Sequence, residues 1–508
     1  MELDHLDHFR QEPVEGRQRP RLRRRRGPDR LLLGASCARG HFLSPGDGRW
    51  SDRVARGPRA AARVTVTVVL FAAVALAVLG VLVLVHRWLW VRLVRDTALA
   101  GRWRTLGTGA LVALPLLTVG ALVSGRAGAP FWRQQALAWP GYLWLAVLLY
   151  LSLALLVAEP VRALWLRRSA PAPAPAPAAA PTPTPPVAAA EPAPEPPSEP
   201  PSEPEPAPAP EPAPAPAPAP EPEPEPEAAR AGAGPTRRVF VARTLAGAAV
   251  AAAAGTVAYG TYGVMRGPAV KRITVPLAKL PRAAHGFRIA VVSDIHLGPI
   301  LGRAHTTRIV DRINATQPDL IAVVGDLVDG SVADLGPAAE PLARLRARHG
   351  AYFVTGNHEY FSGAQQWVDH VRELGLHPLE NARTELPGFD LAGVNDVAGE
   401  REGHGPDFAK ALGDRDPART AVLLAHQPVV IDDAVRHGVD LQLSGHTHGG
   451  QLWPGEYVAA LANPTVAGLE RYGDTQLYVS RGAGAWGPPV RVGAPSDITV
   501  VELASYQA

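Results

Sequence analysis

Histidine, aspartate and asparagine residues recur in five short motifs in the second half of this 508-residue chain. The motifs are Asp294-Ile295-His296, Gly325-Asp326-Leu327-Val328-Asp329, Gly356-Asn357-His358-Glu359, His426-Gln427-Pro428 and Gly445-His446-Thr447-His448-Gly449-Gly450. Imidazole, carboxylate and carboxamide groups together suit divalent ions such as Mn, Fe, Zn or Co. Two such ions, about 3.5–4 Å apart and bridged by a carboxylate, can clamp a phosphoryl group and activate a hydroxide. The residue types therefore indicate chemistry on a phosphoryl group at a pair of metal ions, with Asp326 as the candidate bridge.

Each motif is weak evidence when taken alone. An Asp-x-His pair usually arises by chance, Gly-Asn-His is more often a turn than a site, and Gly-His-x-His is moderately specific. The five together, in order and each after a predicted strand, form a specific signal. The glycines within them, such as Gly325 and Gly356, allow the backbone to turn tightly beside the ions.

The elements that must position these motifs are short apolar runs alternating with helical patterns, which predict an α/β domain. The predicted buried strands are Phe287–Ser293, Leu320–Val324, Tyr352–Thr355, Thr420–Ala425, Leu441–Ser444, Leu477–Ser480 and Ile498–Leu503. The predicted helices are Arg303–Asn314, Glu340–Arg348 and Gln365–Leu374. Because α/β sheets bind ligands at the carboxyl ends of their strands, the five motifs are expected to meet at one edge.

The motif set resembles that of the calcineurin-like metallophosphoesterases. Its local forms, such as GDLVDG, GNHEYFSG and SGHTHGGQ, are similar to those of the membrane-associated bacterial branch that includes the YkuE and YaeI phosphodiesterases. The resemblance covers residues 271–505. It implies a β-sandwich flanked by helices, preceded here by transmembrane helices and a disordered Pro-rich linker.

The resemblance also implies a role for each motif residue. Asp294, His296, Asp326 and His448 would hold one divalent ion, and Asp326, Asn357, His426 and His446 would hold the other. The ions would be Mn, Fe or Zn. His358 would not bind metal but would protonate the leaving oxygen as a general acid. A water between the ions would attack phosphorus in line.

Several further residues have two interpretations. Asp329 either orients a ligand or caps a turn, with the turn slightly favoured. Glu359 either supports His358 or is a surface carboxylate, and Arg481 either contacts a phosphate oxygen or forms a surface salt bridge. The remaining histidines of this region match no ligand position and are expected at the surface: His285, His305, His349, His370, His377, His404 and His437.

The charge distribution and the cysteine content limit which partners and covalent cross-links the chain can have. The net charge is +4, and residues 1–63 form a basic, disordered tail that includes Arg23 to Arg26. An apolar run follows the tail directly, which favours a membrane flank over a nucleic-acid partner. Cys37 is the single cysteine, so no intrachain disulfide can form. The true start of the chain could lie later than Met1.

Three uncharged apolar runs predict transmembrane helices within residues 64–168: Val64–Val85, Leu106–Val123 and Trp139–Ala158. Each approaches the length needed to cross a bilayer, which makes a buried helical core the weaker interpretation. Residues 169–235 are rich in Pro, Ala and Glu and predict an extended, disordered spacer. Residues 236–265 read either as a twin-arginine export signal, implying the export machinery as a partner, or as a fourth membrane helix that is retained.

Basic residues set the expected topology. They concentrate in 86–105 and after 159, which the positive-inside rule places in the cytoplasm. The domain at 271–505 would then be extracytoplasmic and the protein a multi-pass protein of the cell membrane. The basic tail conflicts with this topology unless the true start is later.

These observations predict a membrane-anchored phosphoesterase that acts on phosphodiester or pyrophosphate bonds. Lipid-linked compounds, including those resembling UDP-2,3-diacylglucosamine, would suit a membrane-tethered site. The alternative is a non-catalytic sensor or scaffold that binds metal or nucleotide. A transporter is disfavoured because the three or four short spans contain no intramembrane acidic residue.

Overall fold

The computed structural model describes residues 58–168 and 236–508. The predicted linker 169–235 and the predicted tail up to residue 57 lie outside the described residues. The chain divides into two units, 1–73 and 74–508, and apart from the first part of α1 the features discussed below belong to the second.

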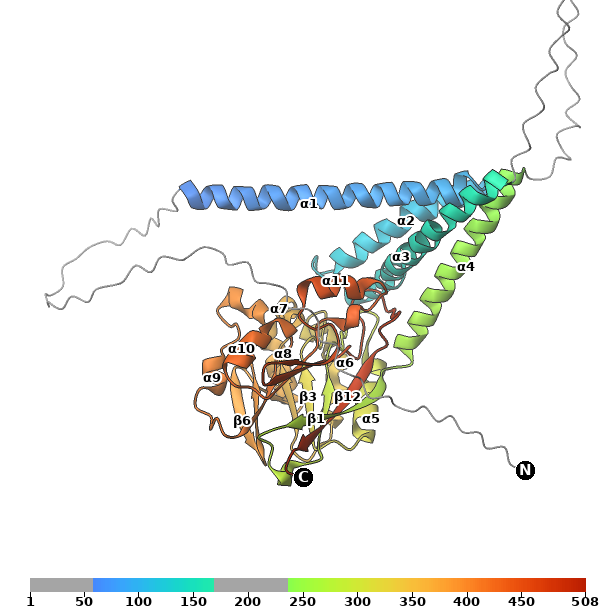
Figure 1. The fold of residues 1–508 in the computed structure, drawn as a ribbon. Coiled ribbons are helices and arrows are strands. Elements are labelled where there is room, and N and C mark those ends of the chain that lie inside the picture. The colour runs from blue at the N-terminus through green and yellow to red at the C-terminus, as the bar shows by residue number, and fades with distance from the viewer. Residues whose placement is uncertain (1–57, 169–235) are drawn as a thin grey trace, which may run out of the picture. The chain divides into compact units, whose positions relative to one another are not determined.

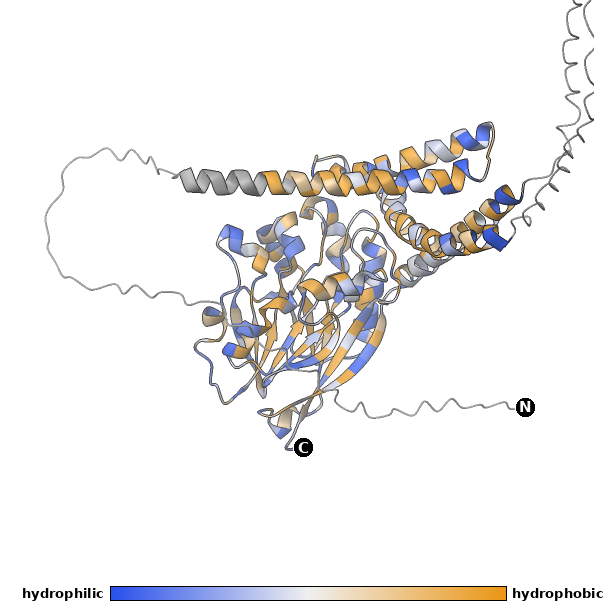
Figure 2. Cartoon of the chain, turned by 45° about the horizontal axis from the view of Figure 1, so that its top comes forward, coloured by the Kyte–Doolittle hydropathy of each residue, from blue (hydrophilic) through white to orange (hydrophobic). Residues whose placement is uncertain are grey.

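Among the described residues, four helices are long and apolar enough to cross a membrane. They are α1 (Pro58–Trp90), α2 (Arg102–Ser124), α3 (Phe131–Arg168) and α4 (Arg237–Met265), and the span of α1 runs on through a π-helical turn, η1 (Val91–Arg95). Figure 2 shows the hydrophobic colouring along these helices, with hydrophilic residues near their ends. The helices contain all three predicted apolar runs, although α1 begins at Pro58, inside the predicted tail. Residues 236–265 form a helix, as both interpretations of that segment require.

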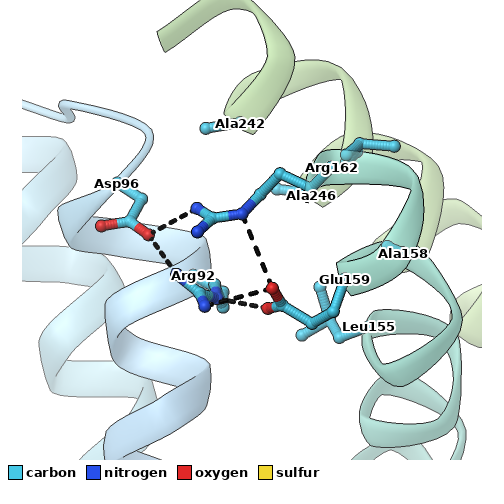
Figure 3. Close-up of a pocket in the computed structure, with 9 residues that line it drawn as sticks. Arg92, Asp96, Leu155, Ala158, Glu159, Arg162, Ala242 and Ala246 are labelled. Carbon is cyan, nitrogen blue, oxygen red and sulfur yellow. Dashed lines mark hydrogen bonds and ion pairs between the residues drawn. The ribbon is translucent and has the colours of Figure 1, made fainter. Parts of the chain in front are cut away.

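A network of paired charges joins the end of η1 to α3. The Arg92 guanidinium binds Asp96, 2.6 Å away, and also Glu159, while Arg162 lies 3.2 Å from Asp96 and 3.6 Å from Glu159. Figure 3 shows these four side chains facing one another in a small pocket that α4 closes with alanines such as Ala242. Because each charge has a partner of opposite sign, the network can stay near the ends of apolar helices.

A short segment connects α4 to the C-terminal domain. Helix α4 ends at Met265 and strand β1 begins at Ala269. The Arg312 side chain of α5 (Arg303–Ala315) donates to the carbonyl of Arg266 at 2.9 Å and also to that of Pro268. The segment is therefore held against the domain.

The described strands form two six-stranded mixed sheets (Figure 1). The first sheet has the order β1 (Ala269–Leu277), β12 (Asp497–Ser505), β2 (Phe287–Val292), β3 (Leu320–Val324), β4 (Ala351–Val354), β5 (His377–Pro378). The second has the order β10 (Gly468–Tyr472), β11 (Thr475–Val479), β9 (Leu441–Ser444), β8 (Thr420–Leu424), β7 (Phe389–Gly393), β6 (Ala382–Leu386). Strands β2, β3 and β4 run parallel to one another, as do β7, β8 and β9. Parallel neighbours bring their carboxyl ends to one edge of each sheet.

Alternate residues of the strands pack on opposite faces. One set, such as Val291 and Leu424, fills the space between the sheets. The other set packs under the outer helices. These helices are α5 (Arg303–Ala315), α6 (Val332–Ala339) and α8 (Ala364–Glu373) on the first sheet, and α9 (Phe408–Leu412) and α10 (Ile431–Arg436) on the second. This arrangement confirms the predicted sandwich of sheets flanked by helices.

One predicted helix is wrong. Instead of a helix over Glu340–Arg348, the chain forms α6 over Val332–Ala339 and a 3₁₀ turn, η4, over Glu340–Arg344. Pro341 lies near the start of η4, where a missing N–H costs little, and the turn stops four residues short of the predicted end. The strands β1, β5, β6, β7 and β10 were not expected from the sequence.

Candidate metal centre

The five sequence motifs meet at the carboxyl ends of strands from both sheets. Asp294 and His296 follow β2, Asp326 and Asp329 follow β3, Asn357 and His358 open the short helix α7 (Asn357–Ser362) after β4, His426 follows β8, and His446 and His448 follow β9. The structure therefore brings together every residue that was predicted to bind metal or to act as the acid.

The backbone at this edge is unusual. Five of the predicted ligands have positive φ angles: Asp294 (52°), His296 (50°), Asp326 (50°), His446 (72°) and His448 (53°). Residues other than glycine rarely adopt this left-handed conformation, and it concentrates at functional sites, where the surroundings hold it. The turn after each strand therefore directs these side chains toward the common edge at a conformational cost.

The first cluster consists of Asp294, His296 and His448, all buried. The two imidazoles face each other, with Nε2 of His296 3.0 Å from Nε2 of His448, and the latter atom is 3.3 Å from Oδ1 of Asp294. His296 Nδ1 faces the Asp329 carboxylate, which favours a proton on that nitrogen and a lone pair on Nε2. Nitrogen and oxygen lone pairs converging in a buried space fit a divalent cation.

The second cluster consists of Asp326, His426 and His446, with Asn357 beside it. His426 donates from Nδ1 to the carbonyl of Val324 at 2.8 Å, so its Nε2 carries the lone pair that faces Oδ2 of Asp326 at 3.1 Å. Nδ1 of His446 lies 3.0 Å from Oδ1 of Asn357. This donor set also fits a divalent cation.

Asp326 lies between the two clusters. Its Oδ2 is 3.1 Å from His426 in one cluster and 3.8 Å from His296 in the other, while Oδ1 accepts from the backbone N–H of His358. Burial alone would raise the pKa of Asp326, but the neighbouring histidines, His426 first, outweigh burial and hold it well below its ordinary value. Gly356 permits this approach, since a Cβ there would collide with the Asp326 carboxylate. The position suits a bridging carboxylate.

Asp329 orients two histidines at once. Its carboxylate lies 2.6 Å from Nδ1 of His358 and 3.1 Å from Nδ1 of His296. Although burial opposes ionisation, the two imidazoles lower the pKa of Asp329 to about 2. The geometry supports the orienting interpretation rather than the simple turn cap. His358 in turn points Nε2 toward Asp326, 3.9 Å away, close enough to be grouped with His296 and Asp326 as a possible ligand.

Asp329→Asn is expected to lower kcat/KM by about 10–100-fold, because loss of the carboxylate weakens the hold on two side chains of the centre. Steady-state hydrolysis and metal content of the purified variant measure this. Asp334→Asn, on the exposed first turn of α6, is the matched control. Wild-type kinetics in Asp329→Asn would contradict the orienting role.

Glu359 is fully buried, so the surface interpretation of this residue is wrong. Its carboxylate accepts from the backbone N–H groups of Asp326 (3.0 Å), Leu327 (2.8 Å) and Gly356 (2.6 Å). Burial and the nearby Asp326 raise the pKa of Glu359 to about 7, despite these hydrogen bonds. Glu359 thus ties the loop after β3 to the loop after β4.

Glu359→Ala is expected to lower the free energy of unfolding by about 1–3 kcal/mol, because it leaves buried N–H groups without an acceptor. Thermal unfolding of the detergent-solubilised chain checks this against Glu373→Ala, whose side chain is exposed on α8. Equal stability of the two variants would show that other groups satisfy these donors.

The sequence analysis did not predict several residues that lie near the candidate metal centre. Arg491 is buried and donates to the carbonyl of His448 at 3.1 Å, with its other terminal nitrogen 3.1 Å from Nδ1 of that residue. The rings of Phe361 and Trp486 flank His358, with centroids 5.5 and 5.7 Å away. Arg491 and Trp486 lie outside every quoted motif, and Phe361 lies within GNHEYFSG but carries no metal-binding group, so a search for ligand residues could not find them.

The structure also gives the surroundings of Arg481 and His305. Arg481 packs against Gly449, in the turn His448–Gly450 that follows β9. His305 is buried in α5, so its predicted surface position is wrong; burial lowers its pKa to about 3 and Arg308 adds to the effect. His305 lies on the face of α5 that packs on the first sheet.

Comparison with known proteins supports the same family. Residues 287–450 match the family described as Metallophos, calcineurin-like phosphoesterase. A Danio rerio protein named "Transmembrane protein with metallophosphoesterase domain" is 38% identical over 259 residues, covering 48% of this chain and 59% of the relative. The match thus spans little more than half of that relative's length.

Two bacterial relatives are matched over most of their length. An "Uncharacterized metallophosphoesterase" of Aquifex aeolicus is 35% identical over 240 residues, covering 46% of this chain and 91% of the relative. "Uncharacterized metallophosphoesterase YkuE" of Bacillus subtilis is 30% identical over 244 residues, covering 46% of this chain and 84% of the relative. With the sandwich fold and the converging motifs, these matches show that the chain belongs to the calcineurin-like metallophosphoesterase family.

Proposed function

We propose that this protein is a membrane-anchored, metal-dependent phosphoesterase that hydrolyses phosphodiester or pyrophosphate bonds. The observation that carries the proposal is the pair of His/Asp clusters that share a boundary at Asp326, with His358 beside them. We assign Asp294, His296, Asp326 and His448 to one ion, and Asp326, Asn357, His426 and His446 to the other. His358 is the general acid.

Divalent ions held by these residues would supply positive charge to the phosphoryl oxygens and make water a stronger nucleophile. His358 holds the proton that the leaving oxygen receives, and Asp329 keeps its ring in place through Nδ1. This pairing leaves Nε2 of His358 as the nitrogen that faces the centre and delivers the proton. Glu359 holds the loops after β3 and β4 in register while the proton moves.

The surroundings of His358 favour a substrate with an apolar portion. Phe361 and Trp486 are both exposed, yet each packs against the imidazole. Exposed rings beside a polar site can bind an acyl chain or another apolar group as it leaves water. A lipid-linked substrate, of which UDP-2,3-diacylglucosamine-like compounds are one type, fits both this rim and the apolar helices.

We place the catalytic domain outside the cytoplasm. The positive-inside pattern supports this orientation. Phe131, at the start of α3, packs against the core of the first sheet, so the α2–α3 connection lies on the same side as the domain. Export of α4 and the domain by twin-arginine machinery, with α4 retained as an anchor, agrees with this arrangement.

The test is turnover by the full-length protein in detergent or nanodiscs, loaded with Mn. Bis-p-nitrophenyl phosphate, a pyrophosphate-linked nucleotide lipid and a phosphomonoester serve as substrates, and elemental analysis gives the metal content. We expect metal-dependent hydrolysis of the diester or the pyrophosphate, above that of the monoester. A folded, metal-loaded protein that hydrolyses none of them would instead support a sensor or scaffold.

A further inference from the structure

Helix α11 (Gly455–Ala462) presents its apolar side chains to the outside. Exposure reaches 65% for Tyr457, 68% for Val458 and 87% for Leu461, and none of the eight residues, all of which the structure describes, is buried. A helix on the surface of a globular domain normally turns its apolar side inward. The apolar side of α11 therefore has no covering within the described residues.

Trp453 extends this apolar surface. It lies just before α11 and is 48% exposed. Trp and Tyr side chains combine an apolar ring with a polar tip, which suits the boundary between water and lipid. We call Trp453, Tyr457, Val458 and Leu461 together the α11 surface.

The α11 surface continues from packing between the catalytic domain and the spanning helices. Leu452, next to Trp453, packs with Val490 and Val492 in one apolar cluster. That cluster contains Trp144 of α3 and Val257 of α4, and the backbone N–H of Arg491 donates to the carbonyl of Gly260 at 3.3 Å. The α11 surface is therefore adjacent in the chain to residues of the domain that pack against α3 and α4.

A bilayer around those helices would be within reach of α11. From Met265 at the end of α4 to Ala269 at the start of β1, the chain can extend over at most about 14 Å. Arg312 holds this segment by hydrogen bonds to its carbonyls, so the domain cannot move far from the helix end. The apolar surface therefore has a lipid phase nearby that could cover it.

We propose that the α11 surface inserts into the polar–apolar boundary of the bilayer and holds the candidate metal centre at the lipid surface. Apolar residues that lie in this boundary bind through the area they bury. The surface is joined closely to the centre, because α11 packs on the turn His448–Gly450 and a Cβ at Gly450 would collide with Glu456. The contact does not depend on catalysis, and an inactive protein would make it too.

The test uses two tyrosines of matched exposure in the full-length chain. Tyr457 is 65% exposed, and Tyr506, near the C-terminus, is 64% exposed. Figure 1 shows the C-terminus at the opposite end of the domain from α11. In a Cys37→Ser background, which removes the single cysteine, Tyr457→Cys and Tyr506→Cys each receive a nitrobenzoxadiazole fluorophore. Leu461→Cys is a second probe of the same surface.

The labelled proteins are placed in nanodiscs of phosphatidylcholine and phosphatidylglycerol, whose two faces are both open to water. Doxyl groups on the acyl chains quench fluorophores in lipid, and iodide quenches those in water. We expect doxyl to quench the probes at 457 and 461 at least twofold more strongly than the probe at 506, and iodide to show the reverse order.

Two results would overturn the proposal. Iodide quenching at 457 and 461 equal to that at 506 would show that the α11 surface faces water. Protection from both quenchers would show that protein covers it, such as a second copy of this chain, which cross-linking through the same cysteines would reveal. Circular dichroism of each labelled variant checks that the fold is kept.

Discussion

His358→Ala is expected to lower kcat by about 10²–10⁴-fold while both metal ions stay bound, because a positioned general acid contributes that much to proton transfer. The loss should be larger for an alkyl or lipid leaving group than for p-nitrophenolate, which leaves readily without a proton. Stopped assays with both kinds of substrate and elemental analysis of the same preparation measure the two parts of this prediction.

His404→Ala is the matched control, since His404 is exposed and its backbone, not its ring, makes the hydrogen bonds at this residue. Its kinetics should equal those of the unmodified chain. The structure makes the outcome informative, because His358 lies close enough to His296 and Asp326 to be a ligand. Loss of an ion from His358→Ala would assign it to metal binding instead.

Asp326→Asn is expected to weaken both ion sites and to lower activity by at least about 100-fold. Loss of a residue that only orients a metal ligand already costs about 10–100-fold, and Asp326 is assigned as a ligand of both ions. The substitution keeps the shape of the side chain but removes the negative charge that lies between the two clusters. Metal titration followed by calorimetry, together with diesterase assays at saturating Mn, separates weaker binding from slower turnover.

Asp369→Asn, an exposed carboxylate on α8, controls for the change of charge. Retention of one ion at full affinity in Asp326→Asn would show that Asp326 belongs to one cluster alone. Retention of both ions and full activity would remove the basis of the proposed mechanism.

Much of the centre could be predicted because its residues follow strands in a fixed order. A buried apolar run, a glycine and a polar residue are local features, and parallel strands then bring their ends together. Val324 and Leu443, for example, are buried strand residues whose runs end just before Asp326 and His446. The sequence thus contained both the ligands and the reason for their meeting.

Residues that support the centre from other parts of the chain were not predictable in the same way. Glu359 looks like a surface carboxylate until the fold places backbone N–H groups around it. Arg491 and Trp486 lie in a late glycine-rich segment, and tertiary packing alone brings them to His448 and His358. Long-range packing of this kind leaves no periodicity or spacing in the sequence.

The surface of α11 shows a related limit. GEYVAALA would read as an ordinary helix whose apolar residues pack inward. In the fold, Glu456 at the start of α11 lies against Gly450, in the turn after β9. Sequence periodicity indicates that a helix has an apolar side, but not which phase that side will meet.

The short, hydrogen-bonded segment between α4 and β1 couples the orientation of α4 to that of the first sheet. Strand β1 pairs with β12 along its whole length, and β12 pairs with β2, the strand that ends at Val292, two residues before Asp294. A helix that tilts to match a thinner or thicker bilayer would therefore apply torque to the sheet rather than bend a slack tether. Membrane thickness would then set the angle between the candidate metal centre and the layer of lipid headgroups.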